Sequence, residues 1–368
     1  MREYLRVAGV VGFFVTAGLL AFSPQSQPTG GKSIVYVTKR GDKFHRKDCQ
    51  YLKGDALDIA LADALRWKYE PCSKCNPQAG GSADEKKPKR VSDVVYGRKD
   101  GLSLTLDVFF PIGKPNGAAV VLVASGGFNS SVGAVHPVFA DSFVKRGYTC
   151  FYVVHGSQPR YTVPEIRADI NRAVRFVRFH AKKYGIEPDR IGIGGVSSGG
   201  LLALLVGTAP QAPKADADDP VDRAASNVQA VAVFFPPTDY LNYGTKDKNF
   251  LEIKDHGIAF RAAHDFYEFD EKEGLRRPIT DKDKLHAIYK DISPIYHVTA
   301  KTAPTLIFHG DKDELVPFQQ SEMYYAKLKE AGVASKLEVR KGAGHGWFSI
   351  LDDLNLVADW YDLHLKGG

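Results

Sequence analysis

A mostly parallel sheet covered on both faces by helices is the fold class that this 368-residue sequence predicts. After residue 90, short apolar segments with strand character alternate with longer helical segments, which is typical of α/β proteins. A Gly-x-Ser-x-Gly pentapeptide at residues 195–199 lies between one such strand and one such helix. Two glycine-containing loops with acids or a histidine follow later predicted strands. Together these observations predict an α/β domain with its chemistry at one sheet edge.

Eight strands are expected in the sheet, at residues 93–97, 102–109, 118–124, 149–154, 190–194, 228–234, 304–309 and 335–340. Helices are expected near residues 135–146, 164–184, 198–208, 318–331 and 350–365. Between residues 236 and 292 the alternation stops, and the segment is rich in aromatic and charged residues. We expect this segment to be a partial lid inserted after the sixth strand. The alternative is a helical insertion that only packs on the sheet.

The pentapeptide Gly195–Gly199 has the local setting of a nucleophile elbow. A short buried strand, Arg190–Gly194, precedes it, and an apolar helix, Gly200–Gly207, follows it. Glycines at both flanks allow the helix to pack closely under a strained turn. Ser197 is favoured over Ser198 as the nucleophile because its two flanking positions are the glycines. A serine nucleophile also needs a base, and the base needs an orienting acid.

Candidates for the acid and the base follow downstream strands. The strand near 304–309 ends in a glycine turn that carries Asp311 and Asp313, and the strand near 335–340 precedes Gly344-His345-Gly346. His345 is therefore the candidate base. Asp313 and Asp311 are both candidates for the acid, although an acid in such a turn can also be a helix cap. We expect the other histidines of the domain to be turn, surface or packing residues, and these include His136, His155, His297 and His309.

From about residue 91 to the C-terminus, the chain resembles the α/β-hydrolase esterases of bacteria, in the feruloyl-esterase-like and hormone-sensitive-lipase-like group. The resemblance is carried by the elbow and by residues 185–193, 219–223, 228–231, 293–295, 309–313 and 344–346. It implies an α/β-hydrolase fold and a triad of Ser197, His345 and Asp313. No cofactor is expected for such catalysis.

An oxyanion hole needs backbone N–H groups aimed at the developing negative charge. One donor is expected to be the N–H of Ser198, the residue after the nucleophile. The second is expected from Gly127 or Phe128, in the loop after the third strand. Related esterases have a His-Gly-Gly sequence in this loop, whereas this chain has Ser125 at the histidine position. How the loop is held is therefore open, and an ordinary glycine turn is the alternative.

Residues 1–31 have the pattern of an export signal or a membrane anchor. Arg2 and Arg6 precede an apolar run from Val7 to Phe22, and polar residues follow. The cleavage site is weak, so an uncleaved anchor is the alternative, although the run is short for a membrane span. We expect an exported protein, periplasmic or extracellular, with membrane or cell-surface attachment through the N-terminus as one arrangement.

Residues 32–77 predict a small, zinc-ribbon-like domain that binds metal. His45, Cys49, Cys72 and Cys75 follow a His-x3-Cys and Cys-x2-Cys pattern, and these side chains suit tetrahedral zinc. A helix is expected from residue 57 to residue 67. The segment resembles the metal-binding module of Ada-type DNA repair proteins with a histidine in place of the first cysteine, which implies only a structural metal. A disulfide from Cys49 to Cys72 or Cys75, or neither arrangement, are the alternatives.

Residues 78–90 are a linker by composition. The net charge of +6 is mild, and no basic tract is interleaved with aromatic residues, so no nucleic-acid partner is expected. The sequence thus predicts an exported serine carboxylesterase acting on small-molecule esters, either small or carbohydrate-linked. The alternatives are a serine peptidase or acyl-peptidase-like hydrolase, and a non-catalytic cell-surface binding protein on a hydrolase fold.

Overall fold

The computed structural model describes residues 34–38, 41–52, 56–66, 69–75, 88–250, 258–347 and 349–366. These residues fall in two compact units, one within Leu20–Lys87 and one from Pro88 onward. The expected export segment, residues 1–31, and residues 78–87 of the expected linker lie outside the described residues. In the part of the chain that the structure describes, no helix is both long enough and apolar enough to cross a membrane.

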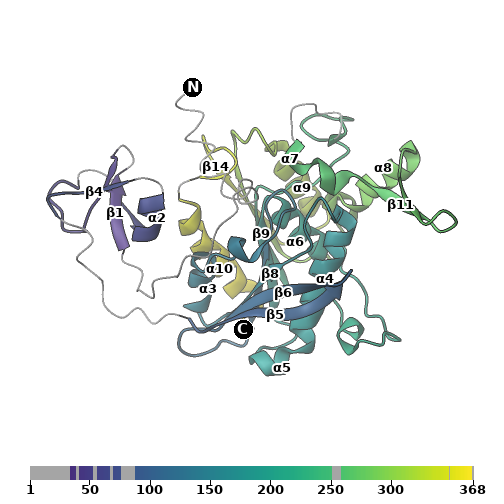
Figure 1. Ribbon diagram of the computed structural model, residues 1–368, viewed down its shortest axis with the longest axis horizontal. Helices are drawn as coiled ribbons and strands as arrows, with labels where there is room; N and C mark the ends of the chain where they lie inside the picture. The colour runs from purple at the N-terminus through teal and green to yellow at the C-terminus, as the bar shows by residue number, and fades with distance from the viewer. Residues whose placement is uncertain are drawn as a thin grey trace. The chain divides into compact units, whose positions relative to one another are not determined.

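The larger unit is built on an eight-stranded sheet, as the sequence predicts (Figure 1). Its order is β14-β13-β10-β9-β7-β8-β6-β5, and all neighbours pair in parallel except β6 with β8 and with β5. The strands are β5 (Arg90–Lys99), β6 (Leu102–Phe109), β7 (Ala119–Ala124), β8 (Thr149–Val154), β9 (Ile191–Val196), β10 (Ala230–Phe234), β13 (Thr305–Gly310) and β14 (Ser335–Arg340).

Helices cover both faces of this sheet. They are α3 (Val138–Val144), α4 (Val163–Phe179), α5 (Ala181–Tyr184), α6 (Ser198–Thr208), α9 (Gln319–Glu330) and α10 (Ile350–Leu365). The expected helix at 164–184 is interrupted at His180, where α4 ends and α5 begins. The α/β-hydrolase fold predicted from the sequence is confirmed.

The side chains of the central strand β7 point alternately to the two faces of the sheet, and each face has its own apolar core. Val121 and Val123 belong to the core that also holds α4, α6 and α9, whereas Val120 and Ala124 belong to the core that holds α3 and α10. Successive side chains of a strand point to opposite faces, so an apolar strand with both faces covered must be apolar throughout. The reactive loops are therefore anchored in strands that are buried on both sides.

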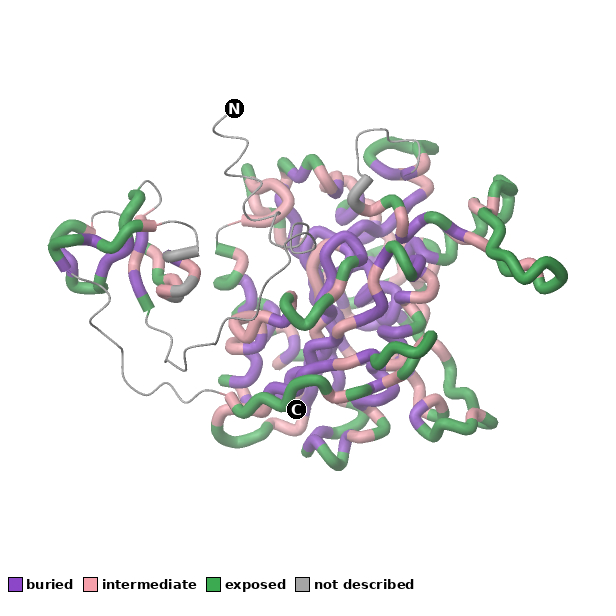
Figure 2. Tube along the Cα trace, in the orientation of Figure 1, coloured by how far each residue is buried: buried purple, intermediate pink, exposed green. Residues whose placement is uncertain are grey.

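An insertion separates β10 from β13, in the place where the sequence predicts a lid. Its described elements are α7 (Ile258–Arg261), η5 (Ala262–His264), β11 (Tyr267–Asp270), β12 (Leu275–Pro278) and α8 (Lys282–Asp291). The β11–β12 hairpin projects from the unit and is largely exposed (Figure 2). The helical turns α7 and η5, in contrast, lie beside the loop that follows β7, as described below.

The smaller unit contains β1 (Ile34–Thr38), β2 (Lys43–Phe44), β3 (Ala56–Ala60), α2 (Leu61–Arg66) and β4 (Glu70–Pro71). The expected helix over 57–67 is wrong in its first half, because Ala56–Ala60 form a strand paired with β1. Leu57 and Ile59 alternate with Asp58 and pack against the small core, so the period of two outweighs helix propensity. Only the second half, α2, is helical.

Candidate active site

Ser197 lies on the sharp turn between β9 and α6. Its backbone has φ 52° and ψ −122°, a conformation that is costly for a residue with a side chain. The flanking glycines permit this turn, since a Cβ atom on Gly195 would lie 2.5 Å from the carbonyl group of Gly199. The N–H of Ser197 donates to the carbonyl of Phe234 on the neighbouring strand, at 2.9 Å. The turn is therefore strained, tightly packed and anchored.

The structure brings the three predicted triad side chains together. The Nε2 atom of His345 lies 3.0 Å from the Oγ atom of Ser197, and its Nδ1 atom lies 2.7 Å from Oδ2 of Asp313. Nδ1 faces a carboxylate, which only accepts, so it carries the proton, and Nε2 is left to accept from the serine hydroxyl. These three residues follow β9, β13 and β14, whose carboxyl ends share one edge of the sheet.

Asp313 is buried, and each of its side-chain oxygens has partners. Oδ1 accepts the N–H groups of Leu315 and Val316 at 2.9 Å each, while Oδ2 faces His345 and lies 3.3 Å from Nε2 of His309. Burial opposes ionisation, but the hydrogen bonds from His309 and His345 outweigh it and lower the pKa of Asp313 to about 2. The carboxylate is therefore ionised across the physiological range.

His309 does more than the packing role that the sequence suggests. It is fully buried, and its Nε2 lies 2.9 Å from the carbonyl of Val316, which can only accept, so Nε2 carries a proton. Its Nδ1 lies 2.6 Å from the hydroxyl of Ser321. His309 thus presents a hydrogen-bond donor toward Asp313. This contact is seen only in the structure and has no signal in the sequence.

Asp311, the alternative acid, has a different place in the structure. Its Oδ1 accepts the N–H of Gly342 at 2.6 Å, which anchors the loop that carries His345. The remaining histidines that the sequence set aside lie elsewhere. His155 bonds the carbonyl of Gly156, and His297 bonds the carbonyl of Asp291, both at 2.7 Å. His136 packs against Phe139.

The expected oxyanion loop lies beside the elbow and is held by Ser198. The Oγ atom of Ser198 accepts the N–H of Phe128 at 3.1 Å and lies 2.9 Å from Oγ of Ser125. Ser125, which directly precedes the two glycines of the loop, therefore fixes the loop through a second serine. Because the N–H of Phe128 is already bonded, Gly127 is the stronger candidate donor. Among the described residues, neither the N–H of Gly127 nor that of Ser198 has a hydrogen-bond partner.

The insertion packs directly on this loop. A Cβ atom added to Gly127 would collide with the ring of Phe260 on α7, so the ring lies against the glycine. The ring of Phe128 lies edge-on to the imidazole of His264, with centroids 5.6 Å apart. Full burial lowers the pKa of His264 to about 3, so it is neutral at physiological pH. An uncharged aromatic wall from the insertion therefore borders the candidate oxyanion hole.

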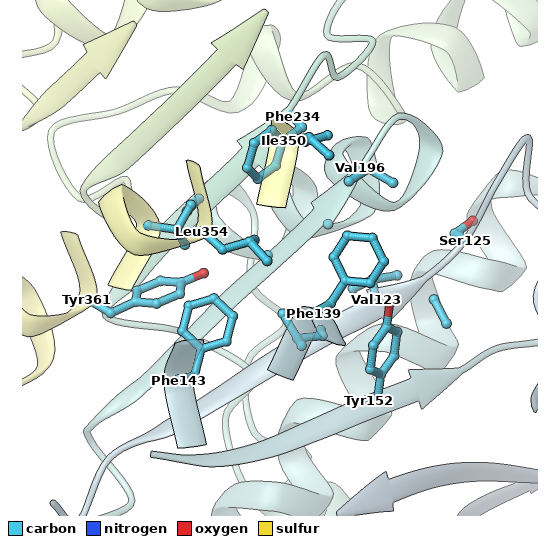
Figure 3. Close-up of a pocket in the computed structure, with 16 residues that line it drawn as sticks. Val123, Ser125, Phe139, Phe143, Tyr152, Val196, Phe234, Ile350, Leu354 and Tyr361 are labelled. Atoms are coloured by element: carbon cyan, nitrogen blue, oxygen red, sulfur yellow. The ribbon is translucent and has the colours of Figure 1, made fainter. Parts of the chain in front are cut away.

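A small apolar cavity of about 40 Å³ lies behind the elbow strand, between β9 and the helices α3 and α10 (Figure 3). Its lining includes Phe139, Phe143, Leu354 and Val196, the residue before the nucleophile. None of the three triad side chains lines it. The cavity is a packing feature of the core beneath the site rather than the place of reaction.

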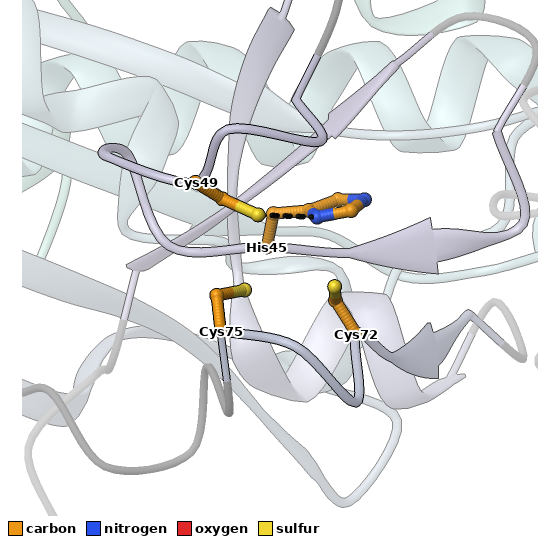
Figure 4. Close-up of side chains that lie close together, drawn as sticks. All are labelled: His45, Cys49, Cys72 and Cys75. Atoms are coloured by element: carbon orange, nitrogen blue, oxygen red, sulfur yellow. Dashed lines mark hydrogen bonds between the residues drawn. The ribbon is translucent and has the colours of Figure 1, made fainter.

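The four expected metal ligands also come together, in the smaller unit (Figure 4). The ligand atoms of His45, Cys49, Cys72 and Cys75 all lie within 4.8 Å of one another, and all four residues are buried. Ligands at about 2.3 Å from a tetrahedral zinc lie roughly 4 Å apart, so the spacing fits such an ion. None of the four cysteines of the chain, Cys150 included, forms a disulfide. Cys150 is buried in the core of the larger unit.

A family model described as BD-FAE matches residues 106–328. Among curated proteins, the chain is 28% identical over 288 residues to a probable carboxylic ester hydrolase, LipM, of Mycobacterium tuberculosis. That match covers 74% of this chain and 60% of LipM, so the chain spans less than two thirds of that relative.

Solved structures share the fold. One is an acetyl ester-xyloside bifunctional hydrolase from Caldicellulosiruptor lactoaceticus, with a TM-score of 0.56, 23% identity, and coverage of 77% of this chain and 97% of that one. Another is a truncated carbohydrate esterase from gut microbiota, with a TM-score of 0.60, 22% identity, and coverage of 78% and 100%.

Proposed function

The chain belongs to the BD-FAE family, and on that premise we propose that it is a serine carboxylesterase that hydrolyses small or carbohydrate-linked esters. The observation that carries the proposal is the continuous hydrogen-bonded line from Asp313 through His345 to Ser197, at 2.7 and 3.0 Å. Such a line is what a serine needs in order to become a nucleophile at neutral pH.

The proposed mechanism follows from the roles of Ser197, His345 and Asp313 in this hydrogen-bonded triad. Ser197 attacks the ester carbonyl while Nε2 of His345 takes its proton, and Asp313 stabilises the imidazolium and fixes its tautomer. The carbonyl oxygen becomes negative and is received by the N–H groups of Ser198 and Gly127. His345 then protonates the departing alcohol. Water repeats the sequence on the acyl-enzyme and releases the acid.

The substrate class is proposed from the surroundings of the oxyanion loop and from the names of proteins with this fold. Phe260 and His264 of the insertion border the candidate oxyanion hole, so the substrate carbonyl would meet an uncharged aromatic wall. The two solved structures with this fold carry names that refer to an acetyl ester-xyloside and to a carbohydrate ester. We therefore propose acetyl and other short esters, including those on sugars, as the substrates.

The test is turnover of p-nitrophenyl esters from acetate to octanoate, together with acetylated xylo-oligosaccharides, by the full chain and by Ser197→Ala. Fluorophosphonate labelling is measured in parallel. We expect labelling of the wild type only, and a loss of about 10⁵- to 10⁶-fold in kcat for the variant. Turnover of acyl-peptides but not esters would favour the peptidase alternative. No labelling of folded wild type would favour a binding protein.

We also propose that the smaller unit holds a structural zinc ion through His45, Cys49, Cys72 and Cys75. Three thiols and one imidazole form a donor set that zinc prefers, and the N–H of Arg46 points to Sγ of Cys75 at 3.4 Å, as expected beside a thiolate. The ion would hold the fold of the unit and take no part in ester hydrolysis. Metal analysis of the purified chain tests this.

Export is proposed from residues 1–31 alone. The basic residues and the apolar run of that segment support a signal or an anchor. Fractionation of cells that express the full chain, compared with a chain lacking residues 1–31, tests the proposal. Retention of the full chain in the cytoplasm would contradict it.

A further inference from the structure

The peptide group between Gly127 and Phe128 is held at both ends. Its carbonyl accepts a hydrogen bond from Nε2 of Gln158 at 2.5 Å, and its N–H donates to Oγ of Ser198 at 3.1 Å. A peptide group is planar and rigid, so two bonds on opposite sides fix the direction of the whole plane. The side chain of Asn129 adds a longer bond of 3.3 Å to the same carbonyl.

The preceding peptide group is held at its carbonyl end only. The carbonyl of Gly126 accepts the N–H of Asn129 at 3.0 Å. In a trans peptide the N–H points away from the carbonyl, so the N–H of Gly127 is directed to the other side of the loop. Within the described residues that N–H meets no hydrogen-bond acceptor. The loop therefore presents one oriented donor.

Gln158 connects this loop to the insertion. It is 8% exposed, and while its Nε2 bonds Gly127, its Oε1 accepts the N–H of Ala263 in η5 at 3.1 Å. Its own backbone N–H donates to the carbonyl of Phe128 at 3.2 Å. One buried side chain thus joins the loop after β7, the loop after β8 and the insertion.

We propose that Gln158 is a positioning residue that sets the direction of the Gly127 N–H and makes it depend on the position of the insertion. The inference rests on the proposed function, because the direction matters only if this N–H receives the oxyanion. Gln158 touches no reacting atom. It clamps the Gly127–Phe128 peptide group, which is joined at the Cα atom of Gly127 to the peptide group that carries the donor N–H. Loss of the clamp lets the loop rotate, and the donor then leaves the place where the charge develops.

Two substitutions separate the two halves of the amide. Gln158→Leu removes both bonds. Gln158→Glu keeps an oxygen that accepts from Ala263, but it replaces the donor to Gly127 with a second oxygen. The matched control is Gln229→Leu, because Oε1 of Gln229 also bonds a backbone N–H, that of Ile191, at 3.0 Å. Ile191 is the first residue of β9, whereas Ser197 follows the last residue of the same strand.

The measurements are kcat and KM for p-nitrophenyl acetate, thermal unfolding, and hydrogen exchange of the peptide that contains residues 125–130. We expect Gln158→Leu to lower kcat about 10- to 100-fold with little change in KM, since removal of a whole oxyanion donor costs about 10²–10³. Exchange at residues 125–130 should become faster in this variant but not in Gln229→Leu. Gln229→Leu should stay within about threefold of wild-type kcat.

The pH profile of Gln158→Glu supplies a readout that lost stability would not move. A protonated carboxyl can again donate to the carbonyl of Gly127, so the ratio of its kcat to that of wild type should rise as the pH falls. The inference is overturned if Gln158→Leu keeps kcat within twofold, or if its loss matches that of Gln229→Leu. An inactive, unlabelled wild type would instead reject the proposed function, and the inference with it.

Discussion

The two groups of reactive side chains in this protein are held in place by different means. Ser197, His345 and Asp313 stand on loops anchored in a sheet with two large cores, and Asp313 accepts two backbone N–H groups. The His45 and cysteine cluster belongs to a unit whose described buried apolar core, apart from the cysteines, is Val35, Val37, Phe44 and Ala64. A large apolar core holds the side chains of its site in place. A small unit with little core depends for its stability on the ion that its site binds.

Among the tests of this comparison, the largest expected effect is the difference between the triad acid Asp313 and its neighbour Asp311. Asp313→Asn should lower kcat by about 10⁴-fold, because an amide disfavours the tautomer of His345 that the reaction needs. Asp311→Asn should stay within about tenfold, since its amide oxygen still accepts the N–H of Gly342. Ester kinetics of the two variants measure the difference. Equal losses would mean that the two acids share the role.

Removal of the metal should unfold the smaller unit but leave the ester turnover of the larger unit nearly unchanged. We expect a strong zinc chelator, or Cys72→Ser, to unfold the smaller unit, because metal binding in such modules supplies most of the folding free energy. Ester turnover should remain within about twofold, since the hydrogen bonds of the triad involve no residue before Pro88. Hydrogen exchange of residues 34–75 and kcat are the two measurements. A parallel loss of turnover would show that the units depend on each other.

Acid should weaken the larger unit through Asp313. Its pKa is lowered to about 2 in the folded chain, against about 3.9 in an unfolded one, so its stabilisation is complete above about pH 4 and lost toward pH 2. At about 1.4 kcal/mol for each pKa unit, the expected contribution is about 3 kcal/mol. Urea unfolding between pH 5 and pH 2 measures it, and Asp313→Asn should show a correspondingly shallower decline. An unchanged decline would assign the acid sensitivity to other carboxylates.

The smallest effect concerns the support beneath the elbow. Tyr361 on α10 is fully buried, packs against Gly192 and Gly194, and donates to the carbonyl of Ile193 at 2.8 Å. Tyr361→Phe should lower the free energy of unfolding by about 1 kcal/mol. Tyr324→Phe is the control, because that buried hydroxyl has no hydrogen-bond partner among the described residues, and its removal should cost nothing measurable. Chemical denaturation of both variants compares them.

The sequence by itself determined the order of strands and helices, the elbow at Ser197 and the spacing of the cysteines. These features depend on residues that are close together in the sequence. Alternation of apolar and polar residues predicts a strand, and glycines on both sides of a residue permit a strained turn. The helix expected over 57–67 failed because β1 offered Leu57 and Ile59 a strand partner from elsewhere in the chain.

Only the tertiary structure decided how the site is held. The different partners of Asp311 and Asp313, the contact between Ser125 and Ser198, and the clamp by Gln158 are all contacts between residues far apart in the sequence. No local sequence pattern indicates the role of Gln158, because a glutamine before a proline in a loop is not typical of any particular contact. Such contacts arise when the strands assemble, because the carboxyl ends of β7, β8, β9, β13 and β14 then bring separate loops to one edge.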